Sequence, residues 1–218
     1  MSPERGSRRQ VRSRKPAGVR RGEIAQAAFE LLSSHRVREF TAQAVARKVG
    51  ISDAALFRHF STMDGIVGAV VDKIEQLLFE GFPPVAADPL ERLGLFFAAR
   101  VAALRRHPGL SRLVFFEHLA QAAGAADLAR VRRFREKSIR FVAGCLEEAR
   151  QGGLLAPGFE VRPLTTLVVG ALLATGHASG GASGRLDADA ARVWRTLEAL
   201  IRRPRPAQPV GPRSPRRG

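Results

Sequence analysis

The chain has 218 residues, of which 45% are hydrophobic, and a formal net charge of +16 at pH 7. This length accommodates one substantial core or a small domain joined to a larger one, but the longest apolar run, residues 167–174, is much shorter than the roughly 20 residues of a membrane-spanning helix. Because the basic N-terminus lacks the apolar segment of a secretory signal and the one cysteine, Cys145, cannot form an internal disulfide, we expect a cytoplasmic protein.

The positive charge is concentrated at the two ends of the chain. Residues 1–21 carry +7 and residues 202–218 carry +6, which leaves +3 of the total +16 for the residues between them. Both ends are rich in Pro, Gly and Ser, so they cannot bury enough apolar surface to offset the entropy of ordering. We predict a disordered basic arm over 1–21 and a disordered basic tail over 204–218. The arm is expected to touch DNA phosphates, with a purely solubilising role as the alternative, and that alternative is favoured for the tail.

Between these ends the hydrophobic periodicity is helical, with no β alternation of useful length. A first amphipathic helix is expected over about 22–34. Thr41 is a candidate N-cap for a second helix, Gly50 supplies the conformational freedom for its end and a tight turn, and Ser52 caps a third helix. Six further helices are expected from residue 61 or 62, and over about 90–107, 110–121, 126–151, 162–179 and 187–202.

The eighth expected helix is apolar on nearly every side, and such a helix must be covered on every side. We infer that the eighth and ninth helices, about 162–202, pack against a second copy of the chain as a homodimer. Burial within the chain under the fifth and seventh helices is the alternative. The small residues that permit close approach are Gly170, Ala171, Ala174 and Gly176.

Residues 41–60, TAQAVARKVGISDAALFRHF, read as a helix, a glycine turn and a second helix, preceded by a supporting amphipathic helix. This is the helix-turn-helix arrangement, whose second helix fits the major groove of B-DNA, about 12 Å wide. The stretch resembles the DNA-binding domain of TetR/AcrR-family transcriptional regulators. The matching positions are Thr41, Val45, Ala46, Gly50, Ile51, Ser52, Ala55, Leu56, His59, Phe60 and Ile66.

The resemblance implies an all-α protein of about nine helices. An N-terminal helix-turn-helix DNA-binding domain over 22–66 would be joined to a helical ligand-binding and dimerisation domain over 67–203. Ligand binding in the larger domain would then change the spacing of the two recognition helices, which must match grooves about 34–36 Å apart. We predict a homodimeric, sequence-specific repressor that is released from its operator by a hydrophobic small molecule, with no cofactor, no metal and no membrane partner.

The exposed arc of the third helix is expected to contact DNA. Arg58 would donate to guanine or phosphate and His59 to phosphate or a base edge, whereas phosphates repel Asp53 unless it accepts from a cytosine amino group. A merely solvated face is the alternative for Arg58 and Asp53. Phe57 and Met63 stand where the family usually has Tyr and Lys, so two backbone contacts are absent. The DNA-binding candidates are Thr41, Gln43, Lys48, Ser52, Asp53, Ala54, Ala55, Phe57, Arg58 and His59.

The candidate ligand-binding residues are mostly apolar and lie in the expected fifth to eighth helices. Ordinary core packing is the alternative for each of them, and we expect the set as a whole rather than any one member to line the ligand site. The set is Phe96, Phe97, Val101, Leu104, Phe115, Phe116, Leu119, Phe141, Cys145 and His177.

A second hypothesis comes from the runs RHPGLSRLVFFEHL and AALFRHF, which resemble the nucleoid-occlusion branch of the same family. That branch binds DNA and a cell-division protein instead of a small ligand, and Leu113 and Phe116 would then belong to a protein-binding surface. A sealed core favours this role, whereas an apolar cavity favours a sensor. We do not expect an enzyme, because Glu117 and His118 are the only adjacent acid and imidazole and they point to different faces of a helix.

Overall fold

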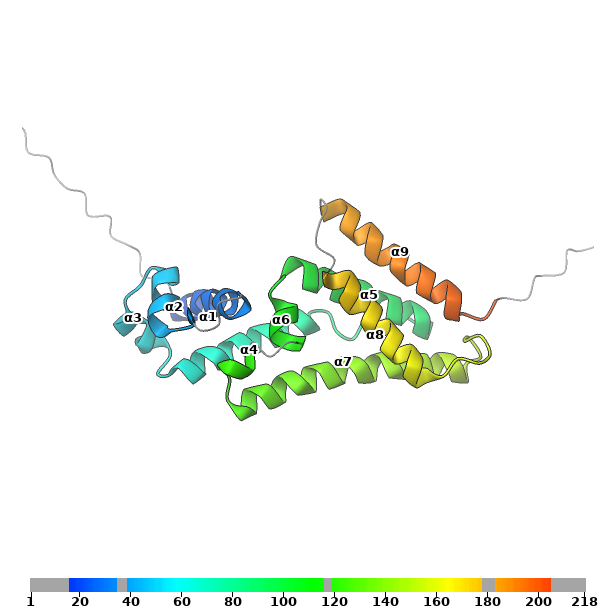
Figure 1. Cartoon of the computed structure of the whole chain (residues 1–218), viewed down its shortest axis with the longest axis horizontal. Coiled ribbons are helices and arrows are strands. Elements are labelled where there is room, and N and C mark those ends of the chain that lie inside the picture. Colours follow the sequence, from blue (N-terminus) through cyan, green and yellow to red (C-terminus); the bar gives the residue numbers. More distant parts are fainter. Residues whose placement is uncertain (1–15, 35–38, 116–118, 178–182, 205–218) are drawn as a thin grey trace, which may run out of the picture. The chain divides into compact units, whose positions relative to one another are not determined.

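The computed structural model describes residues 16–34, 39–115, 119–177 and 183–204, with the backbone alone for 183–188. These residues form nine α-helices, one short 3₁₀ helix and an isolated antiparallel bridge between Leu155 and Arg202, which confirms the all-α fold (Figure 1). The helices are α1 (Ala17–Ser33), α2 (Ala42–Val49), α3 (Asp53–His59), α4 (Met63–Phe79), α5 (Pro89–Arg106), α6 (Leu110–Phe115), η2 (Leu119–Gln121), α7 (Ala125–Gln151), α8 (Val161–His177) and α9 (Ser183–Ile201).

Three helix ends differ from the sequence-based expectation. Helix α1 begins at Ala17 instead of residue 22, so residues 17–21 of the predicted disordered arm are helical. Pro16 is the N-cap residue, with φ −52° and ψ 145°, and its carbonyl accepts the first hydrogen bond of the helix from the N–H of Arg20 at 3.1 Å. Helix α6 ends at Phe115 rather than near 121, and α9 begins at Ser183 rather than 187. The rest of both predicted basic ends, 1–15 and 205–218, lies outside the described residues.

The described chain divides into two compact units. The first contains the residues up to Leu77 together with 109–132, and the second contains residues 78–108 together with those from Arg133 onward. The domain boundary predicted between residues 66 and 67 marks the end of the DNA-binding domain and not the limit of a compact unit. It therefore stays a prediction. No helix in the described part of the chain combines the length and the apolar character needed to cross a membrane.

The first unit is built on α1, which packs against α2, α3 and α6. The start of α6 lies so close to the end of α1 that a Cβ on Gly109 would be 2.1 Å from Cβ of Ser33. Arg112 of α6 donates to the carbonyl of Ser33 at 2.8 Å, which satisfies one of the carbonyls left free at a helix end. The C-terminal end of α1 is therefore fixed by residues nearly 80 positions later in the chain.

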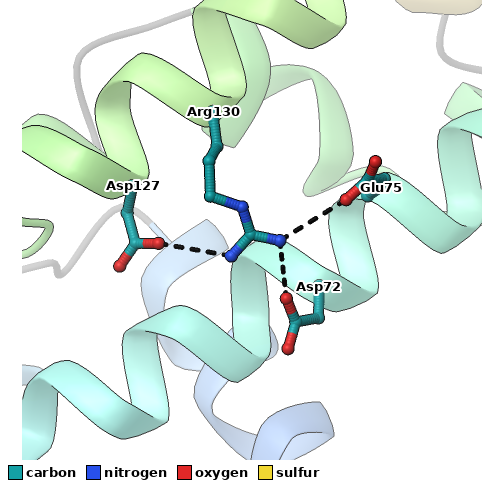
Figure 2. A network of polar contacts seen from close by, with 4 residues as sticks. All are labelled: Asp72, Glu75, Asp127 and Arg130. Carbon is teal, nitrogen blue, oxygen red and sulfur yellow. Dashed lines mark hydrogen bonds and ion pairs between the residues drawn. The ribbon is translucent and has the colours of Figure 1, made fainter.

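A second connection in this unit joins the start of α7 to α4. Figure 2 shows Arg130 reaching from α7 between three carboxylates, two of them on α4. Its guanidinium lies 2.6 Å from Asp72, 3.4 Å from Glu75 and 3.4 Å from Asp127. The hydrogen bond to Asp72 is the main reason that the pKa of Arg130 is raised. Because the three acids are partly exposed, we read this network as an attachment between helices and assign it little net stability.

The second unit is built on α5, which packs against α8 and α9. Its buried stripe includes Leu90, Leu93, Phe97 and Val101. Two contacts depend on the absence of a side chain. A Cβ on Gly94 would lie 2.3 Å from Nε1 of Trp194 in α9, and a Cβ on Gly176 in α8 would lie 2.6 Å from Cδ1 of Leu104.

Helix α8 is covered on one side only. Leu164, Val168 and Leu172 are buried, whereas Leu167 is 61% exposed and Gly170 and Ala174 are exposed. The small residues expected at the dimer contact therefore differ in their surroundings. Gly176 packs against Leu104 of the same chain, while a Cβ on Gly170 would meet nothing within 4 Å.

Candidate nucleic-acid interface

The helix-turn-helix begins and turns where local side-chain chemistry requires it. The N–H of Ala44 donates to Oγ1 of Thr41 at 3.1 Å, so Thr41 is the N-cap of α2. Gly50 adopts φ 74° and ψ 40°, the left-handed conformation that glycine tolerates and that ends helices. The N–H of Ala55 donates to Oγ of Ser52 at 3.2 Å, which caps α3 in the same way. The three residues therefore have the local roles predicted from the sequence.

A small apolar core fixes the angle between α2 and α3. Val45 and Leu56 are fully buried, Ala46 is 1% exposed and Phe60 is 3% exposed. Helix α1 contacts both α2 and α3 and has fully buried residues of its own, such as Ile24. At about 1.5–3 kcal/mol for each large apolar side chain, burial outweighs the caps in holding α3 in place.

The predicted DNA-binding residues are nearly all accessible in the structure. Phe57 is 42% exposed and Arg58 is exposed, on the same arc of α3 as Asp53 and Ala54. Ala55 and His59 are half-buried. The remaining candidates, Thr41, Gln43, Lys48 and Ser52, are exposed on α2 or at the two caps. Whether these residues contact DNA stays a prediction.

Lys48 differs from the other candidates because its charge is already paired. Its Nζ lies 2.9 Å from a carboxylate oxygen of Glu30 in α1, and Gln26 donates to the other oxygen of that carboxylate at 2.6 Å. The hydrogen bond from Lys48, followed by that from Gln26, lowers the pKa of Glu30. Because both charged groups are about half exposed, the pair is worth less than about 1 kcal/mol, and a phosphate can compete for Lys48.

Arg21, which the sequence places in the predicted disordered arm, instead holds the end of α3. Its guanidinium donates to the carbonyl of His59, the last residue of α3, and lies 4.1 Å from the ring centroid of Phe60. A cation at a helix C-terminus is favoured by the helix dipole, and the stack on Phe60 adds a cation–π contact. Arg21 therefore joins the N-terminal part of α1 to the end of α3. No local signal in the sequence singles out Arg21, because its partner lies 38 residues later.

The predicted ligand-binding residues are divided between the two units. Phe115 and Leu119 belong to the first unit, and Phe116 lies outside the described residues. The other members are in the second unit: Phe96, Phe97, Val101, Leu104 and Cys145 are buried, Phe141 is half-buried and His177 is exposed. The ligand role of each stays a prediction.

Two members of this set carry chemistry of their own. Burial raises the pKa of the Cys145 thiol to about 11, so this sulfur is a poor nucleophile at neutral pH. Nδ1 of His177 lies 2.7 Å from the carbonyl of Leu173 within α8. Within the described ranges, no three His, Cys, Asp or Glu residues are grouped so that they could hold a metal ion.

An open groove with a volume of about 1050 Å³ lies in the second unit. It runs between the start of α5, the turn after α7 and the end of α9, and Gly94, Leu95, Leu154 and Trp194 form its apolar part. An ion pair of 2.8 Å between Arg202 and Asp88 lies on its lining. None of the predicted ligand-binding residues is among its described lining residues.

Comparisons with known proteins agree with this geometry. Residues 24–70 match the model for bacterial regulatory proteins of the tetR family, and this range covers most of α1, all of α2 and α3, and the start of α4. The nucleoid occlusion factor SlmA of Aliivibrio fischeri (strain MJ11) is 34% identical over 99 residues, which are 44% of this chain and 50% of that protein. The chain thus spans about half the length of the curated relatives it matches.

Solved structures share the fold at low sequence identity. The ketosteroid transcriptional regulator KstR2 of Mycobacterium tuberculosis has a TM-score of 0.68 and 17% identity, with 85% of this chain and 96% of that chain covered. AibR, solved in complex with isovaleryl coenzyme A and operator DNA, has a TM-score of 0.67 and 20% identity, with 84% of this chain and 98% of that chain covered.

We predict that Arg21→Met lowers the free energy of unfolding by about 1 kcal/mol, because it removes the hydrogen bond to the end of α3 and the stack on Phe60. Urea unfolding at fixed protomer concentration measures this change. The matched control is Arg20→Met, which removes only the 2.7 Å pair with Glu23 one turn away and costs less than about 0.5 kcal/mol. Equal effects of the two substitutions would contradict the role given to Arg21.

Proposed function

We propose that this chain, which belongs to the TetR family of bacterial regulatory proteins, is a homodimeric, sequence-specific DNA-binding repressor that a hydrophobic small molecule releases from its operator. We further propose that it acts in the cytoplasm, on the nucleoid, and without catalysis. The observation that carries the proposal is the exposed arc of α3, supported from behind by the buried residues Val45 and Leu56.

DNA recognition is assigned to α3 and its cap. Arg58 is exposed in the last turn of α3, where a guanidinium could donate to the edge of a guanine or to a phosphate. Thr41 and Ser52 are exposed N-caps, so their hydroxyls are accessible to the backbone of a duplex. The basic residues that precede α1 would add affinity through counterion release.

Dimerisation is assigned to the uncovered side of α8, with α9 beside it. The exposed positions Leu167, Gly170 and Ala174 follow helical spacing along α8, and Leu200 of α9 is 64% exposed. Large apolar side chains left in water favour association, and the two small residues allow a second helix to approach closely. A two-fold dimer would present two copies of α3 to successive major grooves.

A small-molecule ligand is assigned to the second unit. AibR, whose fold is similar, has been solved with both isovaleryl coenzyme A and operator DNA, which is a precedent for a ligand and DNA on this fold. In this chain the second unit contains both the open groove and the phenylalanine-rich segments around α5 and α7. We propose that the larger ligand-binding and dimerisation domain, 67–203, responds to its ligand by changing the spacing of the two α3 helices.

A second candidate function is nucleoid occlusion. The observation in its favour is the 34% identity to the SlmA of Aliivibrio fischeri over 99 residues, which are 44% of this chain. In that case the chain would bind many chromosomal sites and a cell-division protein. Leu113, one of the two residues predicted for such a protein surface, is 1% exposed, so it could contribute only through the packing beneath that surface.

We predict that Arg58→Ala weakens binding to the preferred duplex by about tenfold or more, because a bidentate contact to a base contributes roughly 1–3 kcal/mol. The preferred duplex is selected from random DNA with the wild-type chain, and affinities are measured at two salt concentrations. The control Arg150→Ala removes an exposed arginine that pairs with Glu147 on α7, and we expect no change. Failure of the wild type to enrich any duplex would rule out the repressor.

We predict that Leu167→Glu converts the dimer to a monomer, because the dimer would bury two glutamates against an apolar surface. Sedimentation velocity over a range of concentrations measures the change. The control is Ile139→Glu, which places the same charge at a position that is 43% exposed on α7. If Leu167→Glu remains as dimeric as the control, the α8 face is not the interface.

Mapping the chromosomal sites that the protein occupies separates the two candidate functions. A ligand-responsive repressor is expected at a few promoters, where a hydrophobic inducer reduces its occupancy. A nucleoid-occlusion factor is expected at many loci spread over the chromosome, with occupancy insensitive to any inducer. Occupancy at dozens of dispersed loci would therefore reject the repressor in favour of the second candidate.

A further inference from the structure

Arg100 of α5 is a buried cation without an acidic partner. Arg100 is only 6% exposed. No carboxylate in the described part of the chain forms an ion pair with it. The guanidinium donates to the carbonyl of Leu78 at the end of α4 and to Oγ of Ser138 at 3.3 Å. Burial lowers the pKa of Arg100 to about 10, so the side chain stays charged at neutral pH. Burying a charge is strongly unfavourable unless the charge is paired.

Two phenylalanine rings lie against this cation, and two more pack on those rings. The guanidinium carbon lies 5.0 Å from the ring centroid of Phe79 and 4.8 Å from that of Phe96. Phe82 packs edge-on against Phe79 and Phe141, with centroid distances of 5.2 and 5.0 Å, and Phe96 lies 4.9 Å from Phe141. Phe79, Phe82 and Phe141 are half-buried, so one side of the ring cluster reaches the surface. All of these residues belong to the second unit.

A second cation lies over the same rings. Nζ of Lys137 in α7 is 4.3 Å from the centroid of Phe79 and 5.0 Å from that of Phe82, and Lys137 is exposed. Arg133 and Arg140, at four positions before and three positions after Lys137, are exposed on the same side of α7. Glu80 follows Phe79 in the chain and Glu136 precedes Lys137, and both are exposed. Among the described contacts, neither acid pairs with Arg100 or Lys137.

Capping of α4 accounts for only part of this arrangement. The carbonyl of Leu78 is at the negative end of a helix dipole, which is equivalent to about half an elementary charge. Aromatic faces and a serine hydroxyl supply only partial negative charge. The buried charge of Arg100 therefore has only partial compensation, and a bound anion would offset the cost of its desolvation, with the exposed Lys137 over the same rings as a second positive charge.

We propose that the Arg100 cluster, made of Arg100, Lys137, Phe79, Phe82, Phe96 and Phe141, binds an amphipathic acid: Arg100 and Lys137 hold its carboxylate or phosphate, and the rings contact its apolar part. The inference rests on the proposed ligand-responsive function and gives the chemical class of that ligand. Lys137 is exposed, so its side chain can rotate rapidly between the rings and a bound anion. An anion at Arg100 competes with the Leu78 carbonyl, so binding would release the last turn of α4.

Isothermal titration calorimetry on the full chain, without DNA, tests the proposal with decanoate, decyl phosphate and the neutral 1-decanol. We expect at least one of the two anions to bind about tenfold or more tightly than decanol, because charge-assisted hydrogen bonds to a buried cation are strong. Comparison of the two anions distinguishes a carboxylate ligand from a phosphate ligand.

Three variants locate the anion. Arg100→Met should weaken binding of the preferred anion by about tenfold or more and leave decanol binding unchanged. Lys137→Met, at an exposed position that folding does not depend on, should weaken it by about threefold. Arg150→Met removes an exposed arginine from the same helix and should have no effect. If Arg100→Met does not fold, the Lys137→Met result and the preference of the wild type for anions decide the matter.

Several outcomes overturn the proposal: decanol binding as tightly as the anions, no binding of any of the three probes, or unchanged anion affinity in both cluster variants. DNA binding of the unliganded chain is measured separately. If the chain binds an anion but no DNA duplex, the proposed repressor is rejected and the anion site stands. Intact DNA binding without anion binding rejects the site alone.

Discussion

The burial of Val45 and Leu56 against α1 is the contact on which the proposed DNA interface depends. Helix α3 has seven residues and α2 has eight, so neither would be stable in isolation. Their direction comes from the apolar core that they share with α1, and the caps at Thr41 and Ser52 only determine where each helix begins. The polar side of a short helix can match a DNA groove only when packing fixes the opposite side of the helix. Here that packing comes from Val45 and Leu56, which are fully buried.

The features that the sequence predicted are those with local causes. Thr41, Gly50 and Ser52 act through backbone groups within four residues, so their types and spacing were sufficient to place α2, the turn and α3. The apolar positions Val45, Leu56 and Phe60 followed from helical periodicity in the same way. The all-α fold needed no more than these rules and the family resemblance.

The features that the sequence did not predict have partners far along the chain. Arg21 contacts a carbonyl 38 residues later, and Arg100 contacts one 22 residues earlier. In the sequence, Arg21 is one of many arginines in a basic segment, and Arg100 follows two alanines in an ordinary amphipathic helix. Amphipathic periodicity also cannot tell which side of α8 faces its own chain and which faces outward, because both sides are apolar. Only the fold shows that Gly176 meets Leu104 while Gly170 meets nothing.

The net charge of a segment does not show where its charged side chains gather. The chain between its basic ends carries only +3, yet α7 places Arg133, Lys137 and Arg140 on one side, next to rings that also contact the buried Arg100. A near-neutral total can therefore coexist with a local excess of positive charge. Such an excess persists at a cost in free energy, and it marks a place where an anion would bind more favourably than elsewhere on the surface.

This excess also bears on how a ligand could regulate the protein. A ligand shifts a conformational equilibrium only by the difference in its affinity for the two states. The guanidinium of Arg100 already donates a hydrogen bond to the carbonyl of Leu78 at the end of α4. Helix α4 is the element that follows α3 in the chain. An acid that replaces this carbonyl would bind more tightly to a state in which the last turn of α4 has loosened. The hydrogen bond between Arg100 and Leu78 would then supply the differential affinity that the proposed ligand-responsive function requires.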